Sequence, residues 1–300
     1  MTHHSMIQFS NVVKQFRRNK VLKEINLTID RGQRVALVGS NGAGKTTLIR
    51  CLMGEYKYHG NITIDGQNPR HFREQVLSKV GFVPQLPPPL RMPVGQLIRF
   101  AASLCNANPK QMIKVAAQLG FDALAFNRQP FVKLSGGQKQ KLLIAIALGR
   151  DSQLLVMDEP AANLDPDARH ILFKLLAEKK QSAAMLISSH RLDEVASLVN
   201  RVVEMDQGTI VLDDEVADLV DMTSQLACTI RMIQHEDAFS RALTEWGFHP
   251  APDDNKVWHG QVAGPDRLRF LGMISRYAAL LAGIEMNEIT SSQIEAEHVA

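Results

Sequence analysis

One stretch constrains the fold of this chain more than any other, because it matches the pattern Gly-x-x-x-x-Gly-Lys-Ser/Thr. Its residues are Gly39, Ser40, Asn41, Gly42, Ala43, Gly44, Lys45, Thr46 and Thr47. The apolar run 34–38 before it suits a strand that is buried on both faces. The run 47–53 after it is typical of a helix that ends at Gly54. This order of strand, loop and helix predicts a phosphate-binding loop.

The residue types in the loop suit that chemistry. Gly42 and Gly44 allow a tight turn whose amides approach phosphate oxygens, and the helix N-terminus adds partial positive charge. Lys45 can reach the β- and γ-phosphates, and the Thr46 hydroxyl can ligate Mg²⁺. The alternative is a glycine-rich turn that only joins a core strand to a helix. Because the flanking pattern agrees with the motif, we expect the chain to bind a nucleoside triphosphate.

Composition narrows the class of protein. The 300 residues, 45% of them hydrophobic, suffice for one large domain and a small one. The net charge of +3 is too balanced to indicate nucleic-acid binding, and we expect none. Cys51, Cys105 and Cys228 lack the spacing of metal ligands, which favours a reducing compartment. No apolar run approaches the roughly 18 residues that suggest a membrane span, so we expect a soluble, cytoplasmic protein.

Two adjacent carboxylates follow a second apolar run, 154–157. Asp158 and Glu159 stand at the C-terminal end of this predicted strand, where ligands bind in open α/β sheets. Asp158 suits a magnesium site, and Glu159 suits a base that polarises the attacking water. Two such acids can also serve only as caps for the next helix. The phosphate loop upstream favours the catalytic interpretation.

A second glycine-rich segment precedes a long predicted helix. Leu134, Ser135, Gly136, Gly137 and Gln138 open this helix, with Ser135 as the candidate N-cap. The two glycines leave the first amides of the helix sterically open, which predicts a second anion site. A Ser-Gly-Gly tripeptide often does no more than cap a helix, so the motif alone is weak.

Three single residues are weaker candidates. Phe16 lies before a basic turn, where its ring could stack on a nucleotide base or be an ordinary packed phenylalanine. Gln85 leaves a predicted strand at Pro84, where its amide could contact both a metal ion and water. His190 ends another apolar strand and could bond the γ-phosphate. For both Gln85 and His190, a solvated or structural role is the alternative.

The pattern of apolar runs predicts an α/β fold with a mixed core sheet, an antiparallel β subdomain and a helical insert. We expect a first domain over residues 6–215, with the insert at about 86–133 and helical periodicity from Val94 to about Asn127. A small α+β domain should occupy residues 223–300. Its predicted helices are Glu236–Trp246 and Asp266–Ala282, and its predicted strands are 229–233, 256–262 and 284–289.

The motifs occur in the order found in an ATP-binding cassette (ABC) ATPase, which the stretch 6–212 resembles. Carried over residue by residue, the resemblance implies that Phe16 stacks on adenine and that Lys45 and Thr46 serve phosphate and Mg²⁺. It also implies that Gln85 belongs to the loop that couples to a permease. Ser135, Gly136, Gly137 and Gln138 resemble the signature that contacts the γ-phosphate in a partner subunit. Glu159 resembles the catalytic base, Asp165 the aspartate of the dimer-contact loop, and His190 the switch histidine.

The resemblance implies a head-to-tail dimer of identical chains, with ATP and Mg²⁺ between them, and a separate transmembrane permease that holds the chain at the inner membrane face. The C-terminal extension is similar to that of exporter-type cassettes. Ala161 and Phe16 depart from the commoner Thr and Tyr without removing a required group. A soluble ABC ATPase of translation or repair is the alternative, although such proteins resemble fused cassettes or carry long coiled coils. A GTPase is disfavoured because Asn255-Lys256-Val257-Trp258 lacks the aspartate of a guanine motif.

Overall fold

The computed structural model describes residues 5–179, 183–190, 192–215, 225–263, 266–275 and 277–288. The chain divides into two compact units, residues 1–216 and 217–300. Each unit has its own sheet system and its own hydrophobic core. The predicted boundary between residues 215 and 223 falls on residues 216–224, which lie outside the described ranges.

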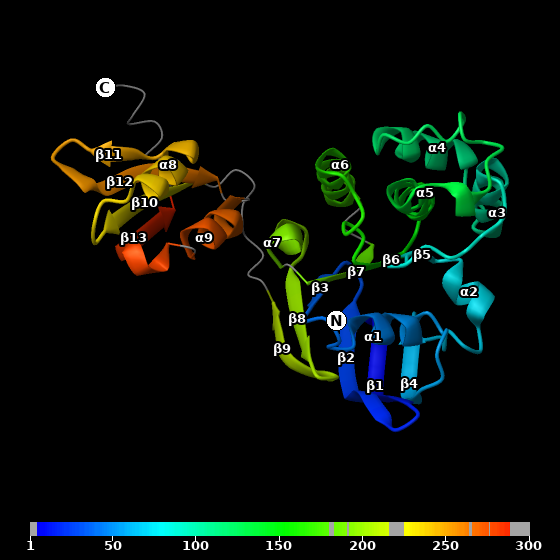
Figure 1. Cartoon of the computed structure of the whole chain (residues 1–300). Coiled ribbons are helices and arrows are strands. Elements are labelled where there is room, and N and C mark those ends of the chain that lie inside the picture. The colour runs from blue at the N-terminus through cyan, green and yellow to red at the C-terminus, as the bar shows by residue number, and fades with distance from the viewer. Residues whose placement is uncertain are drawn as a thin grey trace. The chain divides into compact units, whose positions relative to one another are not determined.

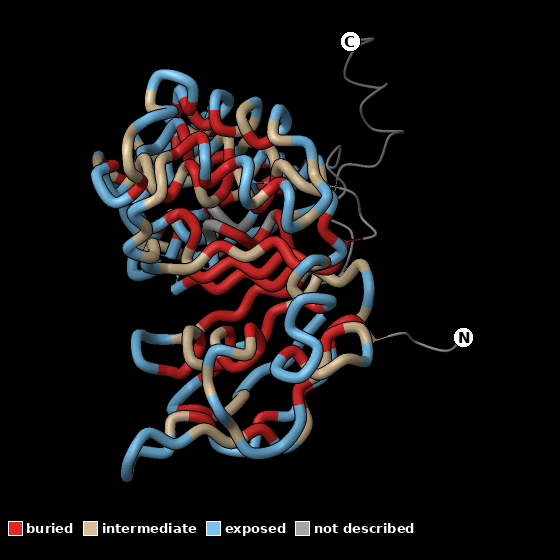
Figure 2. The backbone as a smooth tube through the Cα atoms, turned by 90° about the vertical axis from the view of Figure 1, so that its right-hand side faces the viewer, coloured by how far each residue is buried: buried red, intermediate tan, exposed pale blue. Residues whose placement is uncertain are grey.

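A six-stranded sheet forms the centre of the first unit, with strand order β5-β6-β7-β3-β8-β9 (Figure 1). Its strands are β3 (Arg34–Val38), β5 (Val80–Val83), β6 (Leu154–Asp158), β7 (Ala184–Ser189), β8 (Arg201–Asp206) and β9 (Thr209–Glu215). All pairs are parallel except β8 with β9, which form an antiparallel hairpin. Every residue of β6 and β7 is buried, and Figure 2 shows these strands as a continuously buried band. Strands covered on both faces account for the unbroken apolar runs in the sequence.

Alternate residues of these strands enter two different cores, one on each face of the sheet. Leu154 and Val156 pack in one core with α1 (Lys45–Leu52). Leu155 and Met157 pack in the other with α5 (Gly136–Leu148) and α6 (Pro166–Ala177). α6 ends at Ala177, and residues 178–179 after it form a turn. Short α7 (Leu192–Val195) and η2 (Ala196–Leu198) join β7 to β8.

A three-stranded antiparallel sheet, in the order β2-β1-β4, shares the core that contains α1. β1 (Ser5–Phe16) and β2 (Asn19–Asp30) form a long hairpin, and β4 (His59–Ile64) pairs with β1 on its other side. This sheet is the antiparallel subdomain expected from the sequence. A short helix that we did not predict, α2 (Arg73–Leu77), leads into β5.

The helical insert contains α3 (Val94–Leu104), α4 (Pro109–Gln118) and the turn η1 (Phe131–Lys133). These elements pack on α5 around a third core that includes Phe131, Leu134 and Leu142. The helical periodicity predicted to reach Asn127 ends earlier, since residues 119–130 form turns.

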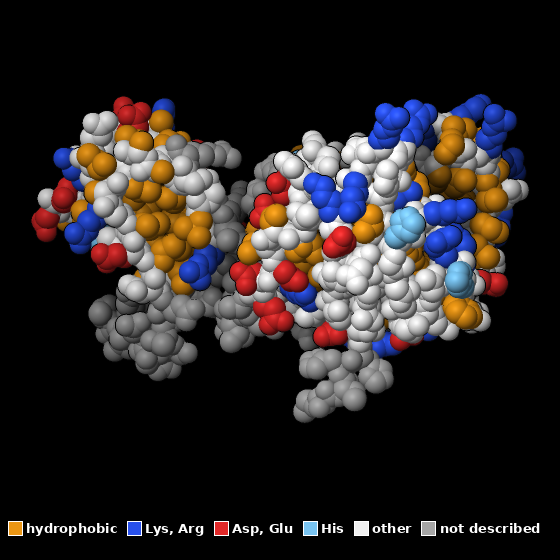
Figure 3. All heavy atoms as spheres, turned by 90° about the horizontal axis from the view of Figure 1, so that it is seen from below, with side chains coloured by type: hydrophobic (Ala, Val, Ile, Leu, Met, Phe, Trp, Pro, Cys, Tyr) orange, Lys and Arg blue, Asp and Glu red, His pale blue; other side chains and the backbone are white. Residues whose placement is uncertain are grey.

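The second unit has a four-stranded antiparallel sheet in the order β11-β12-β10-β13. Its elements run β10 (Gln225–Met232), α8 (Asp237–Glu245), β11 (His249–Ala251), β12 (Asp254–Ala263), α9 (Arg267–Ser275), η4 (Ala278–Leu280) and β13 (Leu281–Glu288). Hydrophobic side chains gather on the face of this unit seen in Figure 3.

The helix predicted over Asp266–Ala282 is wrong at its C-terminal end. α9 ends at Ser275, and β13 begins at Leu281, three residues before the predicted strand. The run 278–282 is apolar throughout, so its periodicity could not distinguish helix from strand. Leu281 pairs with Met232 on β10, and this pairing makes the run from Leu281 onward a strand. The predicted strand end, Ile289, lies outside the described residues.

Candidate functional site

The loop between β3 and α1 has the backbone of a phosphate cradle. Gly42 and Gly44 have φ angles of 88° and 110°, in the left-handed region that favours glycine. Gly44 is the N-cap of α1 and no side chain caps this helix, so no side chain satisfies the first amides of α1. Backbone amides at a helix N-terminus, with the positive end of the helix dipole, suit an anionic ligand. The predicted strand, loop and helix are therefore confirmed as local structure.

Lys45 is buried beneath this loop, with a relative exposure of 5%. Its ammonium donates hydrogen bonds to the carbonyl oxygens of Gly39 at 2.6 Å and Ser40 at 3.2 Å. It also lies 4.0 Å from Oε1 of Glu159. Burial lowers the pKa of the ammonium, while Glu159 and Asp158 act in the opposite direction. The structure thus places a desolvated cation between the loop and the predicted catalytic carboxylate.

Three oxygen-bearing side chains converge beside Lys45 from three different elements. The Thr46 hydroxyl, on α1, lies 3.5 Å from Oε1 of Gln85, just after β5. Asp158, at the end of β6, is 2% exposed and accepts hydrogen bonds from Thr46 and Ser188. Burial raises the pKa of Asp158, and these two hydrogen bonds oppose the shift. Hydroxyl, amide and carboxylate oxygens are the donors that Mg²⁺ prefers, so this set fits the ion.

Glu159 occupies a strained position at the exit of β6. Its φ of 46° is left-handed, which is uncommon for a residue with a side chain. Its backbone amide donates to the carbonyl oxygen of Ser188 at 3.2 Å and to the Ser188 hydroxyl at 3.0 Å. The same hydroxyl donates to Oδ1 of Asp158 at 2.6 Å. Ser188 on β7 therefore orients both carboxylates.

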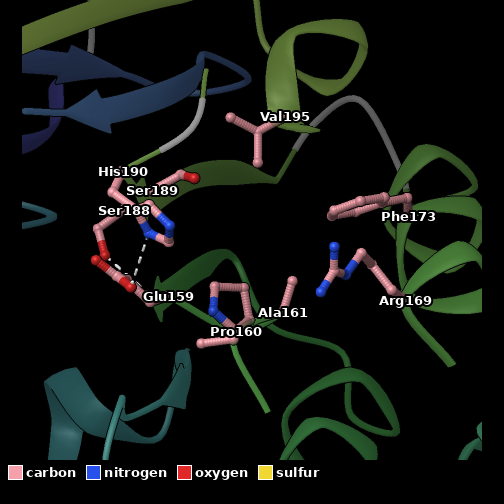
Figure 4. Close-up of a pocket in the computed structure, with 10 residues that line it drawn as sticks. Glu159, Pro160, Ala161, Arg169, Phe173, Ser188, Ser189, His190 and Val195 are labelled. Carbon is pink, nitrogen blue, oxygen red and sulfur yellow. Dashed lines mark hydrogen bonds and ion pairs between the residues drawn. The ribbon is translucent and has the colours of Figure 1, made fainter. Parts of the chain in front are cut away.

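His190, directly after β7, lies against Glu159. Its Nδ1 is 3.2 Å from Oε2 of Glu159, and Figure 4 shows the two side chains pointing toward each other. A hollow of about 200 Å³ adjoins this pair. Arg169 and Phe173 of α6 enter it from the opposite side (Figure 4). The hollow lies beside Glu159 toward α6, and residues 39–47 do not line it.

The signature segment is folded as a helix start. Ser135 caps α5 by accepting a hydrogen bond from the Gln138 amide at 3.2 Å, and Gln138 reciprocates to the Ser135 amide at 3.0 Å. The predicted N-cap is confirmed. Ser135 and Gly136 are exposed. Within the described part of the chain, no hydrogen bond joins residues 135–138 to residues 39–47. Within one chain, the phosphate loop and the signature are therefore not hydrogen-bonded to each other.

Asp165 has two roles within its own chain. It caps α6 by accepting from the Ala168 amide at 2.9 Å, and its other oxygen lies 2.7 Å from the ammonium of Lys141 on α5. Lys141 and the Ala168 amide lower the pKa of this carboxyl. The predicted dimer-contact aspartate is thus tied to the helix that carries the signature.

Phe16 ends β1 with a relative exposure of 39%. Its ring packs edge-on against Tyr56 at 5.2 Å, and the Lys14 ammonium lies 4.3 Å from its centroid. Tyr56 accepts a hydrogen bond from Arg50 of α1. Phe16 is therefore connected to the helix of the phosphate loop through Tyr56, with part of its ring exposed.

Three side chains of this region were not predicted from the sequence. Ser188 bonds both carboxylates, Gln140 of α5 bonds the carbonyl oxygen of Pro160, and Lys141 pairs with Asp165. Ser188 carried a signal, since it follows a buried apolar run at a strand end. Gln140 could be noticed only as a polar residue within an apolar helix.

The parallel sheet, the glycine-rich loop at the start of α1 and the carboxylates at the end of β6 define a P-loop nucleoside triphosphatase. The family described as "ABC transporter" matches residues 22–162. The Nod factor export ATP-binding protein I of Cupriavidus pinatubonensis is 32% identical over 232 residues, which cover 75% of this chain and 70% of that protein. The energy-coupling factor transporter ATP-binding protein EcfA2 of Staphylococcus epidermidis is 30% identical over 240 residues, covering 73% and 83%.

Among solved structures, an ATP-binding subunit of an ABC transporter has a TM-score of 0.64 and 26% identity, and covers 71% of this chain and 91% of that one. The chain belongs to the family of ABC transporter ATP-binding proteins, and it is an ATPase. The family resemblance drawn from the motifs is confirmed, as is the fold. No helix among the described residues is long and apolar enough to cross a membrane.

Proposed function

We propose that this chain is the ATP-hydrolysing subunit of an exporter, that it works as a head-to-tail homodimer, and that it drives a separate membrane permease. The observation that carries the proposal is the convergence of Lys45, Thr46, Asp158, Glu159 and His190 at one end of the central sheet. Lys45 supplies a cation for the phosphates, and Thr46 and Asp158 supply oxygen ligands for a metal ion. Glu159 supplies a general base, which His190 orients.

The proposed roles follow from the contacts. Lys45 and the loop amides bind the β- and γ-phosphates of ATP. Thr46, Gln85 and Asp158 would hold Mg²⁺, which when bound neutralises charge on the phosphates. Glu159 accepts the proton of the attacking water, and His190 holds the Glu159 carboxylate in place through Nδ1.

The dimer is inferred from the exposure of the signature and from the lack of a hydrogen bond between it and the phosphate loop in the described chain. The amides of Gly136 and Gly137 open α5 next to the exposed Ser135, and no hydrogen bond of the described chain carries them to the phosphate loop. A second copy related by two-fold symmetry can supply its signature to each loop, which makes two equivalent sites. ATP would then lie between Lys45 of one chain and Ser135 of the other.

A groove of about 520 Å³ on the cassette is the proposed permease contact. Its apolar floor includes Leu77, Phe82 and Leu104, and charged residues such as Glu74 and Arg150 also line it. Phe82 belongs to β5, which ends shortly before Gln85, and Gln85 contacts Thr46. A short cytoplasmic helix of a permease that docks here would therefore act on the nucleotide site through β5. It would also hold the chain at the inner face of the membrane.

Export is supported by the relative that is named for Nod factor export, although other relatives are named for import. The alternative is an ABC ATPase with a soluble partner. The native thiol of Cys105 lines the groove, so crosslinking from it can distinguish a membrane permease from a soluble partner. In membranes that contain the transporter, a thiol crosslinker on Cys105 should capture a membrane protein, whereas Cys105→Ser should not. Capture of only ribosomal or DNA-bound proteins would contradict the transporter assignment.

The dimer is tested with Glu159→Gln, which retains size and hydrogen bonding but cannot accept a proton. This variant should accumulate as a dimer in ATP-Mg²⁺ and remain monomeric in ADP, as measured by size-exclusion chromatography with light scattering. The further change Ser135→Arg, which places bulk at the signature, should return it to monomer. A Glu159→Gln chain that hydrolyses no ATP and yet stays monomeric in ATP would contradict the shared site.

A further inference from the structure

Gln140 is a fully buried amide in α5, with a relative exposure of 0%. Its Nε2 lies 3.2 Å from the carbonyl oxygen of Pro160, the residue after Glu159. Because a carbonyl oxygen can only accept, the amide nitrogen must face it. The other amide atom, Oε1, has no hydrogen-bond partner among the described residues. A buried oxygen without a partner destabilises the fold, and an apolar side chain of similar size would avoid that cost.

The bond to Pro160 holds a segment that needs support. Glu159 has a left-handed φ of 46°, so its backbone does not rest in an intrinsically favoured conformation. On the upstream side, Ser188 of β7 fixes the Glu159 amide. On the downstream side, Gln140 of α5 fixes the Pro160 carbonyl. The turn that aims the Glu159 carboxylate is therefore held from both sides by other elements.

A second contact attaches the same segment to α5. Lys141, the next residue of the helix, lies 2.7 Å from Asp165, which ends the segment that begins at Glu159. Asp165 also caps α6 through the Ala168 amide. Both ends of residues 159–165 thus bond to consecutive residues of one helix, and this helix begins with the signature at Ser135 and Gly136.

We propose that Gln140 is a positioning residue for Glu159. It transmits the position of α5 to the catalytic carboxylate through the Pro160 carbonyl. This inference rests on the proposed function, in which Glu159 acts in its own chain's site and Ser135 contacts ATP bound to the partner. Gln140 then links the two sites of the dimer. When the signature binds the partner's ATP and α5 shifts, the bond from Gln140 to the Pro160 carbonyl moves Glu159.

The test compares two methionine substitutions in α5. Gln140→Met removes the hydrogen bond at nearly constant volume, and Ile144→Met alters a fully buried residue one turn further along. Gln140→Met should lower kcat about 10- to 100-fold, as expected for a misplaced catalytic group, with unchanged KM for ATP and a Tm no lower than that of the parent. Ile144→Met should lower Tm and leave kcat unchanged.

A double substitution shows whether Gln140 acts through Glu159. Gln140→Met added to Glu159→Gln should cause no further fall in kcat, because the group being positioned is already inactive. The proposal is overturned if Gln140→Met has the parent kcat, if its kcat falls only in step with Tm, or if the two losses multiply. An active Glu159→Gln chain would instead overturn the proposed function itself, so the two failures are distinguishable.

Discussion

The two units of the molecule bury different kinds of side chain. Among the described residues of the first unit, the buried polar and charged ones are Lys45, Gln140, Ser152, Asp158, Ser188 and Ser189. In the described part of the second unit, the buried core is made of apolar side chains and Cys228, with Phe248 stacked on Phe270 at 5.1 Å. Asp158, Ser188 and Ser189 lie at the ends of β6 and β7. Lys45 bonds to the phosphate loop, and Gln140 bonds to the segment that follows β6, so Ser152 is the exception among the six.

Burying a polar group destabilises a fold unless its hydrogen bonds are replaced, and burying a charge does so more strongly. The second unit avoids this cost. The first unit accepts it where strand ends meet the phosphate loop, and there the pKa of Lys45 is lowered and that of Asp158 is raised. Perturbed titration at strand ends is typical of a catalytic region. This contrast indicates that the catalytic region lies in the first unit. The core of the second unit has the apolar composition of an ordinary structural core.

The largest expected effect on ATP binding comes from Lys45→Ala. Loss of the buried ammonium removes the main cation near the β- and γ-phosphates. A hydrogen bond to a charged group contributes about 1.5–3 kcal/mol, so ATP affinity should fall roughly 10- to 100-fold and turnover should be lost. Titration with a fluorescent ATP analogue measures the affinity, and Lys174→Ala on the exposed side of α6 is the control. Parent affinity in Lys45→Ala would remove this residue from the binding site.

Sequence predicted the part of this site that is local in the chain. The loop 39–47 lies between its own strand and its own helix, and Asp158 and Glu159 follow their own strand, so the pattern of neighbouring residues was sufficient. Ser188 lies 30 residues after Asp158, and Gln140 lies 20 residues before Pro160. These contacts depend on how β7 and α5 pack against β6, which periodicity does not specify. The end of α9 was missed for the same reason, since pairing with β10 decided it.

A change in the second unit should separate the two cores. Phe270 is fully buried, stacks on Phe248 and contacts the edge of Trp246 at 5.2 Å. Phe270→Ala should destabilise the second unit by about 3–5 kcal/mol, while ATP hydrolysis by the first unit should be unchanged. The two tryptophans, Trp246 and Trp258, both lie in the second unit, so tryptophan fluorescence during urea unfolding reports on that unit alone. Phe270→Leu is the milder control. If Phe270→Ala lowered the ATPase rate as much as it lowered the stability measured by tryptophan fluorescence, the two cores would not be independent.

The smallest expected effect is a gain in stability from Asp158→Asn. Because the pKa of Asp158 is raised in the folded state, the ionised form is penalised there. The penalty is present above the raised pKa and disappears as the pH falls below the ordinary value for a carboxyl group. In the absence of nucleotide, Asp158→Asn should therefore raise Tm at neutral pH, and the gain should shrink as the pH is lowered. Thermal unfolding between about pH 3 and pH 8 measures this. A gain that is independent of pH would contradict burial as its cause.

The central claim is that Glu159 at the end of β6 performs the chemistry while its neighbours hold ATP. Single-turnover phosphate release, with the protein in saturating excess over ATP-Mg²⁺, tests it most directly, because this rate excludes ATP binding and the release of ADP. A positioned general base contributes about 10²–10⁴-fold, so Glu159→Gln should release phosphate slower by that factor with unchanged ATP affinity. Glu178→Gln, an exposed glutamate at the end of α6, should match the parent. Phosphate release by Glu159→Gln at the parent rate would contradict the account.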